Sequence, residues 1–134
     1  MTASSWTLDG LGEAFESQVR AHCESGPPSY EVRVHRLDRL GAALSKHADA
    51  LVRAISADYG NRPLAGALAA EVLLQLEEIR TTKKNLRAWM APRRPQPRYF
   101  RAAGVDAWVE PTPLGVVGVI SPWNFPVALA IQPT

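Results

Sequence analysis

Cysteine is nearly absent from this sequence of 134 residues, which contains only Cys23. One cysteine cannot form an internal disulfide, and the first residues lack the basic flank and apolar run of a secretory signal. Long apolar runs are absent too, because the stretches 114–120 and 127–131 are too short to cross a bilayer. We therefore expect a cytoplasmic protein in a reducing environment, with no membrane partner.

An excess of charge of one sign is also missing. The 15 basic and 13 acidic residues give a net charge of +2 and are interspersed, so no nucleic-acid partner is expected. The one basic run, 92–101, carries four arginines beside Tyr99 and Phe100, and we interpret it as a solvated connector rather than a nucleic-acid-binding arm. The histidines share no metal-ligand spacing, so we expect no metal site; they are His22, His35 and His47.

The sequence is rich in helical patterning, and its hydrophobic content of 46% is enough for a packed core. A short polar helix is expected at 13–23, ended by the Ser-Gly-Pro-Pro sequence at 25–28. Apolar residues at helical spacing predict helices at 30–59 and 64–90. Ser29 can cap the second helix, Gly60 can end it in a left-handed conformation, and Pro63 allows the next helix to begin. The pattern leaves open whether 30–59 is one helix or two with a kink near Ser45.

Two apolar stripes run along these helices. We interpret them as core, with a packing seam for another subunit as the alternative for the second stripe. The first comprises Leu37, Leu40, Leu44, Ala48, Leu51, Val52, Ile55 and Tyr59, and the second comprises Leu68, Val72, Leu76, Ile79, Leu86 and Met90.

The remainder of the chain is rich in proline, glycine and valine. Three prolines predict that 92–101 is not helical, and β-branched content predicts strands at 105–110 and 116–120. Pro126 lies near the start of a further helix at 127–131. Only 13 residues follow Ser121, whereas a strand-helix-strand unit takes about 30.

These patterns predict an α/β fold in which a helical segment is followed by the beginning of a parallel sheet, left incomplete. The expected divisions are a helical segment at 1–91, a linker and β segment at 92–112, and the start of an α/β domain at 113–134.

The segment 110–126 reads Glu-Pro-Thr-Pro-Leu-Gly-Val-Val-Gly-Val-Ile-Ser-Pro-Trp-Asn-Phe-Pro. It resembles the aldehyde dehydrogenase family, in which a Gly-Val-Val-Gly strand leads into Pro-Trp-Asn-Phe-Pro. Residues 58–62, Glu71 and residues 89–92 are similar to the branch that contains coniferyl aldehyde dehydrogenases. The resemblance covers 29–134 and spans several elements, which makes it more specific than a single short motif.

The resemblance implies NAD- or NADP-dependent oxidation of an aldehyde, aromatic or medium-chain, to a carboxylic acid. It implies that the Asn124 amide binds the oxyanion formed when a cysteine thiolate attacks the aldehyde. Four residues would line the cofactor groove: Ile120, Ser121, Pro122 and Trp123. It further implies that residues 113–134 begin a Rossmann-type, NAD(P)-binding sheet and that the full-length enzyme is a homo-oligomer.

The residues alone support this reading less directly. Asn124 follows a buried-strand pattern, at the edge where open α/β sheets bind ligands, but it could instead cap the following helix. Gly115 and Gly118 do not form a Gly-x-Gly-x-x-Gly phosphate loop, and we interpret them as positions of close strand packing.

Several groups that the family mechanism needs have no counterpart in the sequence. These are the cysteine nucleophile, the glutamate that activates water, and the lysine and glutamate that hold the cofactor ribose; Cys23 matches none of them. We therefore expect a truncated member that is inactive alone. The alternatives are a helical interaction module, in which 29–91 packs against a partner such as a full-length paralogue, and a non-functional remnant.

Overall fold

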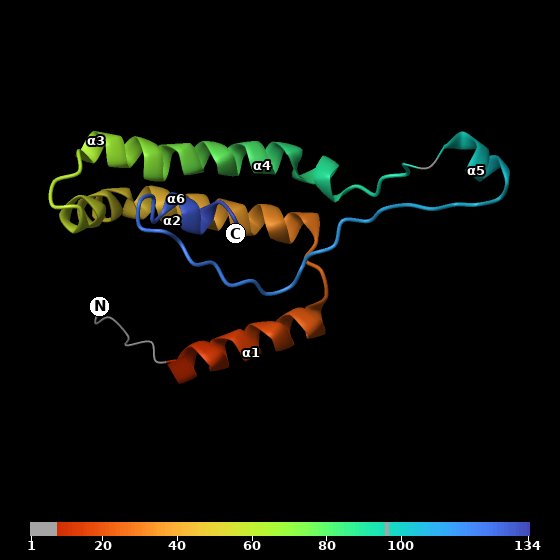
Figure 1. Ribbon diagram of the computed structural model, residues 1–134, viewed down its shortest axis with the longest axis horizontal. Coiled ribbons are helices and arrows are strands. Elements are labelled where there is room, and N and C mark those ends of the chain that lie inside the picture. Colours follow the sequence, from red (N-terminus) through yellow and green to blue (C-terminus); the bar gives the residue numbers. More distant parts are fainter. Residues whose placement is uncertain (1–7, 96) are drawn as a thin grey trace. The chain divides into compact units, whose positions relative to one another are not determined.

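The computed structural model describes residues 8–95 and 97–134, whose helices are drawn in Figure 1. They group into two compact units, one formed by residues 8–28 and 112–118, the other by the remaining described residues. No helix in these described ranges is long and apolar enough to cross a membrane. The helical elements are α1 (Leu8–Ser25), α2 (Tyr30–Asp58), α3 (Leu64–Ala67), the π-helical η1 (Leu68–Leu73), α4 (Leu74–Met90), α5 (Arg98–Ala102) and α6 (Ala128–Ile131).

The first unit contains α1 and the extended segment 112–118. The helix predicted at 13–23 is confirmed and is longer at both ends. Gly115 has a φ of +103°, and a Cβ there would lie 3.4 Å from Cδ2 of His22. The glycine is therefore required by its backbone conformation and by a histidine, and the predicted reason, close strand packing, is wrong.

The second unit is built on a helical hairpin whose first arm is α2. Ser29 precedes this helix, and its hydroxyl oxygen accepts a hydrogen bond from the amide of Val32 at 3.3 Å. The helix runs without interruption through Ser45 and ends before Gly60, whose φ is +79°. The predicted helix, its cap and its left-handed terminator are confirmed, and the kink is absent.

The second arm is one continuous helical run from α3 through η1 to α4 (Figure 1). The helix predicted at 64–90 is confirmed, with a difference in its middle. Residues Leu68–Leu73 are π-helical, with wider turns in which each amide bonds five residues back. Glu71 and Val72 are both buried within this segment.

The two arms pack antiparallel, so the start of α2 faces the end of α4 (Figure 1). The Arg87 guanidinium lies 4.0 Å from the ring centroid of Tyr30, and Lys83 pairs with Asp38. A cluster at the other end of the hairpin forms the core, with Val127 packed against it. The two predicted stripes supply most of the buried apolar side chains of the arms, and Ala67 is buried beside them. Those from the stripes are Leu44, Val52, Ile55, Val72, Ile79 and Leu86.

The predicted strands at 105–110 and 116–120 do not form. The described residues contain no strand, and their only β pairing is an isolated antiparallel bridge between Arg93 and Val109. A strand needs a neighbour to accept and donate its ladder hydrogen bonds, and no second extended segment pairs with residues 116–120. The start of a Rossmann-type sheet is therefore not observed, whereas the helix at the end of the chain is, as α6.

The prediction that 92–101 contains no helix is wrong for its last part. Helix α5 begins at Arg98, directly after Pro97. All three prolines of the run precede that helix, where a missing amide hydrogen costs nothing because the first turn has no intrahelical acceptor for it.

Candidate functional site

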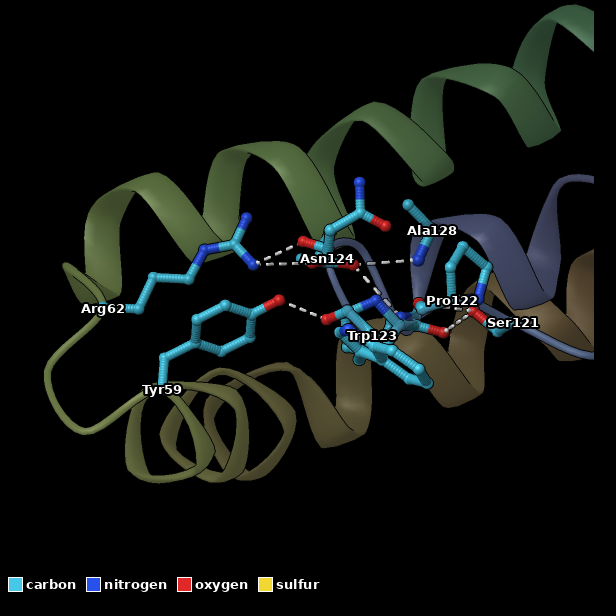
Figure 2. A network of polar contacts seen from close by, with 10 residues as sticks. Tyr59, Arg62, Ser121, Pro122, Trp123, Asn124 and Ala128 are labelled. Carbon is cyan, nitrogen blue, oxygen red and sulfur yellow. Dashed lines mark hydrogen bonds and ion pairs between the residues drawn. The ribbon is translucent and has the colours of Figure 1, made fainter.

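The site predicted from the sequence lies on the segment between residue 120 and α6. Figure 2 shows that Ser121, Pro122, Trp123 and Asn124 form a turn beside Tyr59 and Arg62. The side chains on this turn are open to solvent, with Ile120 98% and Trp123 86% exposed and Asn124 also exposed. The four predicted cofactor residues and Asn124 are therefore contiguous and accessible.

Two side chains after α2 hold the backbone of this turn. The hydroxyl of Tyr59 donates to the carbonyl of Trp123, and Nη1 of Arg62 donates to the carbonyl of Asn124 at 3.0 Å (Figure 2). The Arg62 Cζ atom lies 5.2 Å from the ring centroid of Tyr59 and 5.0 Å from that of Phe125. Both rings are close enough to attract the guanidinium, so Arg62 is bound by hydrogen bonds and by two aromatic faces.

A buried carboxylate holds the other side of the turn. Glu71 is 0% exposed, and its Oε2 accepts from the amides of Val127 and Ala128 at 3.1 and 2.9 Å. Its Oε1 lies 3.2 Å from Nη1 of Arg62, whose side chain is 18% exposed. Burying a carboxylate is costly unless charged or amide donors surround it, and here three donors do so.

Ser121 closes the turn from within. Its hydroxyl donates to the carbonyl of Pro126 at 2.8 Å (Figure 2). Because a hydroxyl has one hydrogen, this bond leaves Ser121 with only acceptor capacity toward a ligand.

The Asn124 side chain has no partner of its own in the described part of the chain. Its amide projects away from the Trp123 ring in Figure 2, and only its backbone carbonyl is bonded. Helix α6 has no side-chain cap from Asn124, since Glu71 accepts from the amides at its start. The alternative that Asn124 caps the helix is therefore wrong, and both amide hydrogens are available to a ligand.

The predicted cofactor residues 120–123 form one open side of the turn, here called the wall. Ile120, Pro122 and Trp123 present exposed apolar surfaces on which a flat ring or a ribose can lie. The carbonyl of Trp123 is occupied by Tyr59, so contacts from this segment would come from side chains and from the carbonyl of Ile120.

Cys23 is exposed on α1, in the first unit. Groups of His, Cys, Asp and Glu able to hold a metal are absent from the residues that the structure describes.

The sequence interpretation named Tyr59, Arg62 and Glu71 only as part of the resemblance and, for Tyr59, of the first stripe, and it missed their role in supporting the turn. A signal for Glu71 was present, because it adjoins Leu68, Val72 and Leu76 on the apolar stripe. A charged residue on a buried helix face needs an opposite charge nearby, and Arg62 just upstream was available.

Comparisons with known proteins give a consistent result. The model of the aldehyde dehydrogenase family matches residues 11–134. The coniferyl aldehyde dehydrogenase of a Pseudomonas species is 40% identical over 123 residues, which are 92% of this chain and 25% of that protein. A probable coniferyl aldehyde dehydrogenase of Caulobacter vibrioides is 34% identical over 125 residues, 92% of this chain and 26% of that protein.

A rat protein described as a dimeric, NADP-preferring aldehyde dehydrogenase is 31% identical over 133 residues, 99% of this chain and 27% of that protein. The chain thus spans about a quarter of the length of these relatives. No solved structure matches it significantly. The family matches confirm the resemblance predicted from the sequence.

Proposed function

The chain belongs to the aldehyde dehydrogenase family, and on this basis we propose that it supplies the oxyanion-binding amide for oxidation of an aldehyde to a carboxylic acid with NAD or NADP. The substrate class that its relatives' names favour is an aromatic aldehyde of the coniferyl type. The amide is that of Asn124, and the remaining catalytic groups come from polypeptide that corresponds to the rest of the relatives' length.

The observation that carries this proposal is the contrast between the backbone and the side chain of Asn124. Its backbone carbonyl is held by Arg62, while its side-chain amide is exposed and unbonded within the described residues. A donor that is held in place but has no protein acceptor is suited to an oxygen that becomes negative only during a reaction. A purely structural asparagine would use its amide to satisfy backbone groups.

The chemistry asked of Asn124 is limited to hydrogen-bond donation. When a thiolate adds to the aldehyde carbon, the carbonyl oxygen becomes an oxyanion, and the Asn124 amide donates to it. A fixed donor at such a position is typically worth about 2.7 to 4 kcal/mol in the barrier. Asn124 gains or loses no proton in the step.

The cofactor would lie against Ile120, Ser121, Pro122 and Trp123, and it would accept the hydride when bound. The exposed Trp123 ring and the Pro122 ring offer apolar contact on one side only. Ser121 keeps the wall rigid through its bond to Pro126. Because one relative is described as NADP-preferring, we keep NADP beside NAD as the proposed cofactor.

An oligomer of identical subunits in a cytoplasmic setting is part of the same proposal. Its support is the relative described as dimeric, together with a single cysteine that allows no internal disulfide.

A chimera tests the function. Residues 11–134 replace the matching quarter of the Pseudomonas coniferyl aldehyde dehydrogenase, and NAD(P)H formation from coniferyl aldehyde is followed. We expect a folded, active chimera in which Asn124→Ala lowers turnover about a hundredfold to a thousandfold. A folded chimera that is inactive, or an Asn124→Ala burst rate equal to the parent's, would reject the proposal.

A further inference from the structure

We propose that Glu71 and Arg62 are positioning residues that jointly fix the backbone position from which the Asn124 amide projects. This inference rests on the proposed function of Asn124 and names the groups that prepare it. Neither side chain touches the reacting atoms in this scheme, and both act through the backbone of the turn.

Glu71 is the group common to both sides of the turn. One of its oxygens receives the amides of Val127 and Ala128, after the turn, and the other receives Arg62. Its complete burial removes competing water, so these bonds are the carboxylate's only means of satisfying its charge. The carboxylate therefore holds α6 and the arginine in a fixed relation.

Arg62 links Glu71 to the backbone of Asn124. Its Nη1 has two hydrogens, and it lies 3.2 Å from Glu71 and 3.0 Å from the carbonyl oxygen of Asn124. The rings of Tyr59 and Phe125 restrict the plane of the guanidinium. A lysine would keep the charge but lose the planar fork and its stacking.

The backbone sets where the Asn124 amide can reach, because the side chain has no anchor of its own in the described residues. The carbonyls of residues 123 and 124 and the amides of residues 127 and 128 are all held, which fixes the backbone on both sides of Phe125. The Cα–Cβ direction of Asn124 is set by that backbone. If the turn shifts by about 1 Å, the amide leaves its productive place, and such misplacement can cost on the order of a hundredfold in rate.

Glu71→Gln is the informative substitution. It preserves size but presents an amide group to either Arg62 or the two backbone amides, so one set of donors loses its acceptor. Glu77→Gln is the matched control, because Glu77 lies six residues further along, on α4, and pairs with Arg80 at the surface.

The first test uses the 134-residue chain and measures hydrogen exchange by NMR. We expect the amides of Val127 and Ala128 to exchange at least about tenfold faster in Glu71→Gln than in Glu77→Gln, with Val52 in the core unchanged. Unchanged rates at both amides would overturn the proposal. Equal acceleration at Val52 would also overturn it, since Glu71 would then support the fold as a whole.

The second test uses the active chimera. Glu71→Gln and Arg62→Lys should each lower kcat about tenfold to a hundredfold while KM for the cofactor changes less than about twofold. In an Asn124→Ala background, Glu71→Gln should lower kcat little further, because a positioning residue has no effect once the group it positions is gone. Additive losses would overturn the proposal.

The two tests separate this inference from the function on which it rests. Full turnover in Asn124→Ala would remove the proposed function and the catalytic part of this proposal together. If the amides of Val127 and Ala128 exchange at unchanged rates in Glu71→Gln while Asn124→Ala strongly lowers kcat, only the positioning role is rejected.

Discussion

Among single residues, Gly60 carries a backbone conformation that other residues adopt at a cost. Its φ is +79°, and it directly follows the C-cap residue Tyr59. Gly60→Ala should lower the free energy of unfolding by about 1 to 2 kcal/mol, since a Cβ is strained in the left-handed region. Urea denaturation followed by circular dichroism at the helix band measures this loss.

Gly66 provides the matched control for that substitution. It lies within α3, and a Cβ there would meet nothing within 4 Å. Gly66→Ala should therefore raise the stability by about 1 kcal/mol, because alanine favours a helix. Loss of stability in Gly66→Ala, or none in Gly60→Ala, would contradict this account of the two glycines.

Residue-level features divide into those that local patterns reveal and those that depend on distant partners. Ser29 and Gly60 were predictable, because caps and terminators depend on neighbours in sequence. The burial of Glu71 was not predicted, since its donors lie up to 57 positions away. The Pro-Trp-Asn-Phe-Pro segment pointed to Asn124 through resemblance, whereas the bonds that hold it required the fold.

At the scale of elements, the start of α2 can be tested through its cap. The Ser29 hydroxyl oxygen accepts from the amide of Val32, one of the donors left unpaired in a first turn. Ser29→Ala should reduce the free energy of unfolding by about 1 kcal/mol, and Ser29→Asp should retain most of it. Equal stability of Ser29→Ala and the parent in urea denaturation would show that water replaces the cap.

The same first turn makes part of the stability depend on pH. The backbone amide of Glu31 and the hydroxyl of Ser29 donate to the Glu31 carboxylate and lower its pKa below the ordinary value of 4.5. A lowered pKa in the folded state means that the stabilisation is complete above the unfolded value and is lost as the pH falls through the folded one. We expect the parent to be more stable than Glu31→Gln at about pH 7, and the difference to shrink as the pH falls below the ordinary value of 4.5.

Denaturation midpoints of the two proteins at several pH values check this dependence. Asp49, whose pKa is lowered by its bond from Arg53, lies in the exposed middle of α2 and serves for comparison as Asp49→Asn. A difference between parent and Glu31→Gln that grows as the pH falls would have the wrong sign for this mechanism.

Helices and strands differed in how far the sequence predicted them. The apolar stripes were sufficient to predict α2 and the second arm, because a helix makes its backbone hydrogen bonds within itself. The run at 116–120 has strong β propensity but, in the described residues, no partner segment, and propensity alone does not form a ladder. Helix α5 was missed because proline was interpreted as a breaker throughout, although Pro97 is compatible with a helix beginning at the next residue.

For the whole molecule, activity depends on which catalytic groups the chain can assemble by itself. Its one cysteine is exposed on α1, and the predicted cofactor residues form one open wall. We expect the purified 134-residue chain to form no NAD(P)H from coniferyl aldehyde. We also expect the dissociation constant for the cofactor to exceed about 1 mM, which is a binding free energy of less than about 4 kcal/mol. One apolar wall leaves the phosphates and most of the ribose in water.

Calorimetric titration with NAD and with NADP measures this affinity directly. Trp123→Ala is the informative variant if any binding is detected, since the Trp123 ring is the largest exposed surface on the wall. A dissociation constant well below about 1 mM that Trp123→Ala abolishes would show that residues 120–123 bind the cofactor unaided. Aldehyde-dependent NAD(P)H formation by the chain would contradict the expected inactivity. If that activity remained in Cys23→Ser, it would require a nucleophile other than the only cysteine in the chain.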